Sequence, residues 1–284
     1  MLGFINVYKP SGITSNAVVQ KIKKRFGIKK IGHMGTLDPL ASGILPIAVG
    51  KATRLFDLSL NKTKRYIAEF EFGYTTDTLD ITGNKTATVD KIPTIQEIQD
   101  ILPNFLGLIS QVPPNFSAKN INGQRAYDLA RQGIEFELKP KDIEIFDIKV
   151  IEQVSTSKFK FDITCSSGTY IRSIARDIAT QLRTLGCMTA LERVETGNFN
   201  LQQSVTLDKL LESNIGDYLL SPLVVFDDFN VHEISDEILV RLLNGLQTKY
   251  QAFKKPTFIV NKNQIVGVAK CNEETLSLQI FLYE

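Results

Sequence analysis

One carboxylate near the N-terminus has surroundings that suit chemistry. Asp38 lies in the stretch GHMGTLDPLASGILP, residues 32–46, and is the only acidic residue between Met1 and Phe56, a span that carries nine lysines and arginines. Positive charge around a carboxylate lowers its pKa and keeps its ionised form available, as a nucleophile requires. Neighbouring glycines permit unusual backbone torsions and let a ligand approach the chain closely: these are Gly32, Gly35 and Gly43.

The same aspartate also has a structural interpretation. Asp38 precedes Pro39, and an Asp before a Pro commonly begins a turn in which the carboxylate bonds to its own backbone. The dipeptide alone favours that structural role. The glycines and the surrounding positive charge favour the catalytic one.

Four further side chains could serve a site on nucleic acid. Tyr66 and Tyr170 could stack on an extruded base, or they could be core or capping aromatics. Arg172 could hold a carboxylate through two hydrogen bonds, or it could lie on a helix surface. His33, among glycines, could brace RNA or simply belong to a turn.

The composition excludes several classes of protein. The three cysteines are far apart and only two histidines accompany them, so no usual zinc ligand set can be assembled, and we expect no metal. The odd number of thiols, the lack of a leader-like start and the lack of a long apolar run predict a cytoplasmic protein with no membrane partner. The phosphate-binding, dinucleotide-binding and hydrolase-elbow motifs are absent.

Charge and hydrophobic patterning indicate how these residues are positioned. The net charge is only +2. The segment NAVVQKIKKRF is predicted to form a helix that Ser15 caps and Gly27 ends. Its lysines are followed by Lys29 and Lys30, and no acidic residue lies between them. That surface is either a solvated helix face or a face that contacts phosphates. KRYIAEFEFG alternates as a strand, and CSSGTYIRSIARDIATQL predicts a turn followed by a helix with Arg172 off its apolar stripe.

The order of these elements predicts an α+β fold with a mixed, largely antiparallel sheet, because strands and helices do not alternate as regular βαβ units. A boundary near residue 230 separates the predicted sheet from a small β-rich C-terminal segment. The residues alone therefore indicate a basic-faced protein with an aspartate site that could act on nucleic acid. They do not reach a named reaction.

Four segments together resemble the TruB family, the tRNA pseudouridine-55 synthases. They occur in the family's order between about Asn6 and Phe199: GHMGTLDPLASGILPIAVGKATR, KRYIAEFEFGYTTDTLDITG, PPNFSAKNINGQRAYDLARQG and CSSGTYIRSIARDIA. The resemblance implies an isomerase that converts a uridine in the T loop of tRNA to pseudouridine by base flipping, with an aspartate and without a metal or organic cofactor. It also implies that the protein could assist tRNA folding.

Residue roles follow from the same resemblance, position by position. Asp38 would be the catalytic aspartate, Tyr66 would stack on the flipped uracil, and Arg172 would pair with the Asp38 carboxylate. Tyr170 would lie beside the base, Leu191 would form part of an apolar pocket, and His33 would occupy space left in the T loop. The remaining substrate-binding positions would be Lys9, Lys64 and Arg65.

The resemblance also implies a domain organisation and a mode of action. Residues 1–230 would form a catalytic domain of the pseudouridine-synthase type with a thumb-like insertion at about 75–140, and residues 231–284 would form a small PUA-like RNA-binding domain. We expect a monomer that acts on the T arm and T loop of tRNA and requires no guide RNA or protein partner. Two alternatives remain: a non-catalytic tRNA-folding chaperone, and an enzyme that does use a guide RNA and partner proteins.

Overall fold

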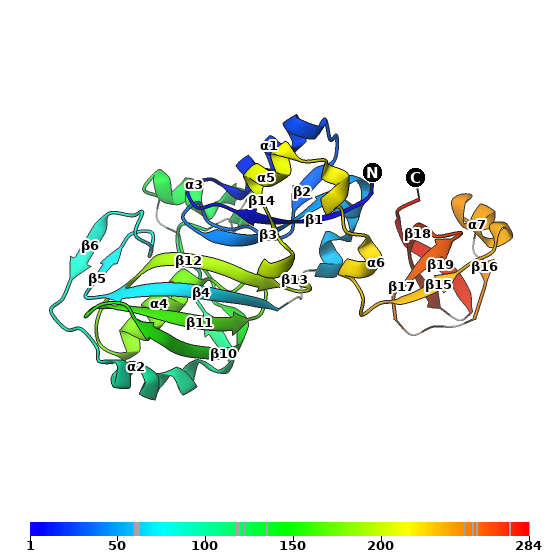
Figure 1. The fold of residues 1–284 in the computed structure, drawn as a ribbon. Helices are drawn as coiled ribbons and strands as arrows, with labels where there is room; N and C mark the ends of the chain where they lie inside the picture. Colours follow the sequence, from blue (N-terminus) through cyan, green and yellow to red (C-terminus); the bar gives the residue numbers. More distant parts are fainter. Residues whose placement is uncertain are drawn as a thin grey trace.

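The computed structural model describes residues 1–59, 63–117, 120–121, 123–134, 136–246, 248–251, 253, 255–272 and 274–283. A large mixed sheet dominates the fold (Figure 1). Its neighbours are antiparallel except β1 with β14 and β3 with β12, which confirms the predicted mixed, largely antiparallel α+β sheet. In sheet order its strands are β14 (Val205–Thr206), β1 (Gly3–Lys9), β3 (Ser42–Val49), β12 (Gly186–Thr196), β4 (Lys64–Phe72), β11 (Lys158–Cys165), β10 (Lys141–Gln153) and β7 (Gly107–Gln111), while β2 (Ile31–His33) pairs with β3 and β13 (Phe199–Asn200) with β12.

Strand β4 shows why this sheet forms where the sequence alternates. Tyr66, Ala68, Phe70 and Phe72 are buried on one face, and the intervening residues on the other face are partly exposed. The ring of Phe70 lies 4.6 Å, centroid to centroid, from Phe161 on β11. Burial of one side chain in every two is the pattern that a one-sided sheet requires.

Helices cover this buried face and share one apolar core with it. α1 (Ser15–Phe26), α2 (Ile95–Ile101), α4 (Ile171–Gln181) and α5 (Leu207–Glu212) all contribute side chains to that core. A capping box of Thr94 and Glu97 begins α2. The predicted cap of α1 is wrong by one residue: Thr14 accepts the hydrogen bond from Ala17 N, because the Ser15 side chain is buried and bonds elsewhere.

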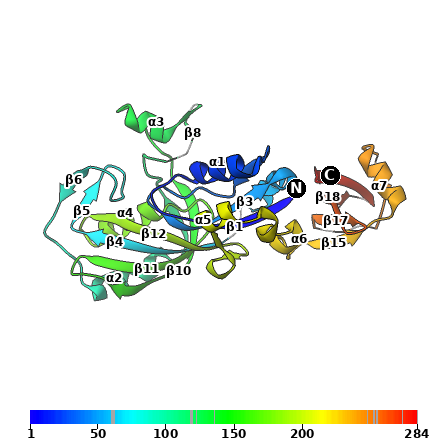
Figure 2. The ribbon, with the colours of Figure 1, turned by 45° about the horizontal axis from the view of Figure 1, so that its top comes forward.

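The stretch 75–140 is divided between several substructures. β5 (Tyr74–Thr76) and β6 (Lys85–Thr88) form a hairpin, and α2 and the 3₁₀ helix η2 (Leu102–Phe105) lead into β7, which joins the main sheet. β8 (Asn120–Ile121), β9 (Gln124–Arg125) and α3 (Ala126–Arg131) follow, and α3 projects from the rest of the molecule (Figure 2). Residues 118, 119, 122 and 135 of the expected insertion lie outside the described residues.

A second sheet forms the C-terminal part of the chain. Its order is β15 (Asn230–Glu233), β17 (Thr257–Asn261), β18 (Gln264–Asn272), β19 (Thr275–Phe281) and β16 (Thr248–Lys249), with α7 (Asp236–Leu243) packed against it. Its first strand in the chain, β15, begins at Asn230.

The two sheets are joined by an apolar cluster. Phe4 and Ile44, on the face of the main sheet opposite α1, pack in one cluster with Phe226, Phe258 and Leu282. The 3₁₀ helix η1 (Gly50–Ser59) lies between them, and its Arg54 donates to the carbonyl of Phe281 at 2.8 Å. No helix of the described residues is both long and apolar enough to pass through a membrane.

Candidate active site

Two polar side chains form hydrogen bonds with the backbone of the turn that contains Asp38. Ser15 Oγ lies 2.9 Å from both the amide nitrogen and the carbonyl oxygen of Leu37, the residue before the aspartate. The buried Lys9 Nζ donates to the carbonyls of Pro10, Pro39 and Ala41 at 2.9, 3.4 and 2.6 Å. These bonds satisfy polar groups that burial would otherwise penalise, and they fix the turn against the end of β1 and the start of α1.

One glycine in this stretch is required by its surroundings. Gly43, where the turn enters β3, has a φ of +105°, a region that residues with a Cβ atom rarely adopt. A Cβ atom there would also lie 2.3 Å from the carbonyl oxygen of Arg193 on the neighbouring β12. Only glycine lets the chain turn from Asp38 into the sheet this closely.

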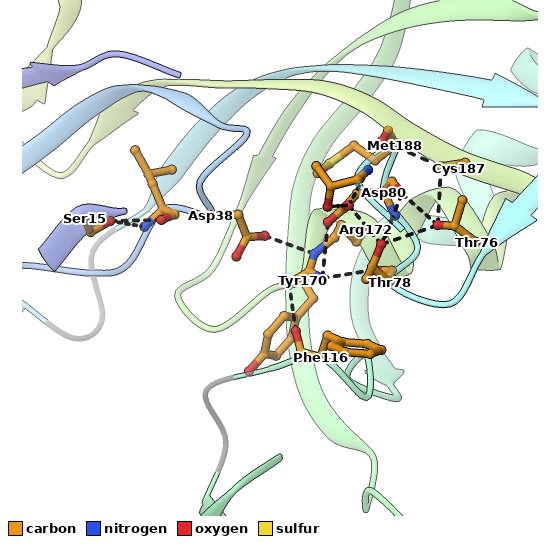
Figure 3. Close-up of polar contacts among 12 residues, drawn as sticks. Ser15, Asp38, Thr76, Thr78, Asp80, Phe116, Tyr170, Arg172, Cys187 and Met188 are labelled. Carbon is orange, nitrogen blue, oxygen red and sulfur yellow. Dashed lines mark hydrogen bonds and ion pairs between the residues drawn. The ribbon is translucent and has the colours of Figure 1, made fainter. Parts of the chain in front are cut away.

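The Asp38 carboxylate forms an ion pair with an arginine from α4 (Figure 3). Arg172 Nε lies 3.0 Å from Asp38 Oδ2, and Arg172 Nη1 lies 3.4 Å from Oδ2 of a second carboxylate, Asp80. Arg172 also donates to the carbonyls of Thr78 and Phe116 at 3.0 and 3.1 Å. Its side chain is only 7 % exposed because those two segments cover the first turn of α4. The alternative that Arg172 lies on a helix surface is therefore wrong.

The two carboxylates differ in their exposure and in the hydrogen bonds that they already accept. Asp80 is 6 % exposed, and its Oδ1 already accepts from the hydroxyls of Thr78 and Thr82 and from the Thr82 amide. Asp38 is 34 % exposed. Asp80 is therefore committed to the protein, whereas Asp38 is available to a ligand.

The pKa of Asp38 departs from the sequence-based prediction. Burial raises it above the ordinary value, the Arg172 guanidinium opposes that rise, and the nearby Asp80 charge adds to it. The expected lowering by a cationic field is wrong because the basic residues of the first 56 positions, apart from Lys9, contribute no appreciable charge effect at the carboxylate, while desolvation and Asp80 act directly on it.

A cavity of about 670 Å³ opens above the carboxylate. Tyr66 on β4 and Leu191 on β12 give it apolar walls, and both side chains are less than 10 % exposed. Burial also raises the pKa of the Tyr66 phenol, which stays neutral at physiological pH. The walls could hold a planar ring beside Asp38 and exclude water from it. The predicted residues that line this cavity are Asp38, Lys64, Tyr66, Tyr170, Arg172 and Leu191.

Comparison with known proteins identifies the family of this chain. Residues 23–171 match the model described as TruB family pseudouridylate synthase (N terminal domain). The chain belongs to the TruB family. It is 39 % identical over 290 residues to a tRNA pseudouridine synthase B of Clostridium novyi, covering 99 % of this chain and 100 % of that relative. It is 42 % identical over 251 residues to one of Clostridium tetani, covering 88 % and 86 %.

Two solved structures share the fold of nearly the whole chain. A chain in the structure of an H/ACA RNP bound to a substrate RNA containing 2′-deoxyuridine superposes with a TM-score of 0.74 at 21 % identity, covering 99 % of this chain and 85 % of that one. A chain in a Cbf5-Nop10-Gar1 complex gives 0.71 at 24 % identity, covering 99 % and 84 %. At these identities the likeness concerns the fold alone.

Of the other predicted site residues, His33 lies beside this cavity rather than in it. His33 lines a neighbouring cavity of about 540 Å³, which shares Lys64 and Gly168 with the first. Burial, aided by the charge of Arg193, lowers the pKa of His33. Burial likewise lowers the pKa of Lys64 to about 8, so its ammonium is mostly retained at neutral pH. A role in binding substrate stays a prediction for each.

Two predicted binding residues have protein partners in this structure. Lys9 is fully buried and its ammonium supports the Asp38 turn, so in this conformation it does not face a ligand. Arg65 lies on the face of β4 opposite Tyr66, where it forms a two-pronged pair with Asp162 at 2.9 and 2.7 Å. Arg65 lines neither of these two cavities.

Sequence reasoning missed two residues of the site. Asp80 lies in DTLDITG, which is part of the second segment that resembles the TruB family. The feature that could have identified it is a second carboxylate in a threonine-rich turn. Arg193 lies opposite Tyr66 in the sheet, fully buried, and donates to the carbonyls of Ile44 and Gly35 at 2.7 and 3.2 Å. No clear signal in the sequence marked it, because Glu192 and Glu195 are charged residues of the same strand. Among the described residues, no three His, Cys, Asp or Glu side chains gather as metal ligands would.

The raised pKa of Asp38 predicts the acid limb of the pH profile. A reaction that needs the ionised carboxylate should slow as pH falls through that pKa, which lies above the ordinary value of about 3.9. The measurement is kcat/KM on a tRNA substrate between about pH 3.5 and pH 8, since this ratio reports groups of the free enzyme. An acid limb with its midpoint at or below the ordinary value of about 3.9 would contradict the burial described here.

Proposed function

We propose that this chain is a tRNA pseudouridine synthase that isomerises the T-loop uridine, uridine-55, of tRNA. The single observation that carries the proposal is the arrangement of Asp38, one-third exposed at the base of an apolar-walled cavity and paired with the buried Arg172. The names of the relatives, tRNA pseudouridine synthase B, support the same substrate class.

The reaction exchanges one bond to the sugar for another. The bond between N1 of uracil and C1′ of ribose breaks, the base turns, and a bond forms between C5 and C1′. The proton on C5 is released and N1 gains one, so the product is an isomer of the substrate. Extruding the uridine costs a few kcal/mol, which stacking and backbone contacts must offset.

The cavity residues fit separate parts of this reaction. Asp38 would act on the reacting nucleotide, because Asp80 is already saturated by Thr78 and Thr82. Tyr66 would stack on the extruded ring, and Leu191 would complete the apolar wall. Tyr170, which lines the cavity immediately before α4, would lie beside the base. Arg172 would hold the carboxylate in one orientation through its Nε.

A basic surface leads away from the cavity and would bind the RNA backbone. Thr14, at the start of α1, lines the cavity, and the exposed lysines at the far end of that helix and beyond it extend from there. These lysines take part in none of the ion pairs found among the described residues. They are Lys21, Lys23, Lys24, Lys29 and Lys30.

Replacing four of these lysines by glutamine should weaken tRNA binding and flatten its dependence on salt. Each lost phosphate contact lowers the slope of log affinity against log salt by about 0.7 to 0.9. The variant carries Lys23→Gln, Lys24→Gln, Lys29→Gln and Lys30→Gln, and binding is titrated at several salt concentrations. The matched control neutralises Lys149 and Lys160, whose charges are already paired on β10 and β11. Equal slopes for the two variants would remove this surface from the RNA interface.

We further propose that the protein acts alone, as a monomer in the cytoplasm, and that residues 231–284 form a PUA-like RNA-binding domain beside a catalytic domain of residues 1–230. The test is conversion of an unmodified tRNA transcript by the purified protein with no other RNA or protein, followed by mapping of the product. Conversion at the T-loop uridine supports the proposal. Conversion only after a guide RNA and partner proteins are added would favour the alternative, and tight binding without conversion would favour a folding chaperone.

A further inference from the structure

A buried glutamine at the end of β7 holds the start of the helix that carries Arg172. Gln111 is 2 % exposed, and its side-chain amide faces the backbone of Tyr170. The Tyr170 amide donates to Gln111 Oε1 at 2.8 Å, and Gln111 Nε2 donates to the Tyr170 carbonyl at 3.2 Å. One side chain therefore fixes both polar groups of a single backbone residue.

That backbone residue is the N-cap of α4. Tyr170 has extended torsions, with φ −98° and ψ 107°, and its side chain makes no capping hydrogen bond. Its carbonyl begins the helix by accepting from the amides of Ser173 and Ile174. A helix start without a side-chain cap leaves backbone N–H donors to be satisfied by other groups. Gln111, on β7, accepts from one of these donors, the Tyr170 amide.

The segment that follows Gln111 continues the same contact along α4. Ser173 Oγ and Arg176 Nη2 both donate to the carbonyl of Val112, at 3.0 and 2.9 Å. Arg172 Nη2 donates to the carbonyl of Phe116, and Figure 3 shows Phe116 and Tyr170 beside the Asp38–Arg172 pair. The first two turns of α4 are thus bonded to one short stretch, residues 111–116.

Burying a polar side chain costs free energy unless its hydrogen bonds are made, and both bonds of the Gln111 amide are made to Tyr170. Here both ends of the amide are matched to the N-cap that precedes Arg172 by two residues. Arg172 in turn has its orientation fixed at Nε by Asp38 and at Nη1 by the carbonyl of Thr78.

We propose that Gln111 is a positioning residue: by clamping the Tyr170 backbone it sets the direction in which Arg172 presents its Nε to Asp38. The expected effect on the reaction rate rests on the proposed function. Small displacements of a catalytic group can cost up to about a hundredfold in rate. We expect Gln111→Met, which keeps the length of the side chain and removes both hydrogen bonds, to lower the single-turnover rate about tenfold or more.

The experiment separates positioning from folding and from RNA binding. Single-turnover conversion and tRNA affinity are measured for Gln111→Met, for Arg172→Lys and for the double variant. Gln181→Met, an exposed change at the other end of α4, is the matched control. If Gln111 acts through Arg172, Gln111→Met should lower the single-turnover rate of the Arg172→Lys variant by less than about twofold, because the effects of coupled residues are not additive. Affinity should stay within about twofold of the wild type.

A second readout requires no RNA. The Arg172 Nε–H signal in the NMR spectrum, assigned by its absence from Arg172→Lys, reports the ion pair with Asp38 and should shift in Gln111→Met but not in Gln181→Met. Additive rate losses, an unshifted signal, or equal falls in rate, affinity and thermal stability would overturn the proposal. A wild-type protein that converts no tRNA would instead overturn the proposed function, and the Arg172 signal would then decide the role of Gln111. If Gln111→Met does not fold, Gln111→Glu, which loses the donor to Tyr170 but keeps the acceptor, takes its place.

Discussion

Asp38→Asn is expected to abolish pseudouridine formation while leaving most tRNA affinity. Among the described residues that line the cavity, Asp38 is the only carboxylate left open to a ligand, so conversion should fall by more than about 10⁴-fold. Binding should change by only a few-fold, because the lysines of α1 and the loop after it are separate from the carboxylate. Arg172 would keep Asp80 and two carbonyls as partners, so the fold should persist.

The rate is measured in a single turnover with enzyme in excess, and the affinity by titration of labelled tRNA. Asp57→Asn, at an exposed position of η1, is the matched control and should behave as the wild type does. Loss of affinity in step with activity would mean that Asp38 contributes to binding rather than to chemistry. Retained conversion would remove Asp38 from the reaction altogether.

Arg172→Met should lower both stability and activity. The change leaves the buried Asp80 without a cationic partner and Asp38 without its orienting bond. Breaking a buried pair by removing one partner typically costs about 3 to 5 kcal/mol in the free energy of unfolding. The Asp80 side of the pair should dominate, because Asp38 is one-third exposed and water screens its share.

Urea unfolding at several pH values measures this effect. In Arg172→Met, Asp38 loses the charge that opposes the rise of its pKa, so that pKa should rise further. Protonation of Asp38 then relieves its unpaired charge, and the stability gap to the wild type should narrow as pH falls. Arg183→Met, an exposed change just after α4, is the control. A loss below about 1 kcal/mol, or a gap that widens toward acid, would contradict the buried network.

Local patterning was enough to predict the framework of the site. The alternation of β4 and the apolar stripe of α4 both depend on residues close in sequence, and each lies where expected. The mixed sheet followed from the irregular order of strands and helices. What these patterns could not supply is which loops meet, because that depends on tertiary contacts between distant segments.

The residues around Asp38 illustrate this limit. Arg172 is off the apolar stripe of its helix, and only the cover provided by Thr78 and Phe116 makes it a buried residue. Asp80 reaches the same guanidinium from a different loop, and its charge helps to reverse the expected direction of the Asp38 pKa. Charges counted along the sequence therefore misjudged the pKa of Asp38, because burial and the charges of Arg172 and Asp80, which come from other segments, act on it more strongly than Lys9 does.

The most direct test of the central claim is release of tritium from a tRNA transcript labelled at C5 of uridine. Forming the C5–C1′ bond must expel that hydrogen, so the wild-type protein should release tritium from the intact transcript. Replacing the T-loop uridine by cytidine should abolish the release. Release that persists with the altered T loop would contradict the proposed target, and tight binding with no release from either transcript would contradict catalysis itself.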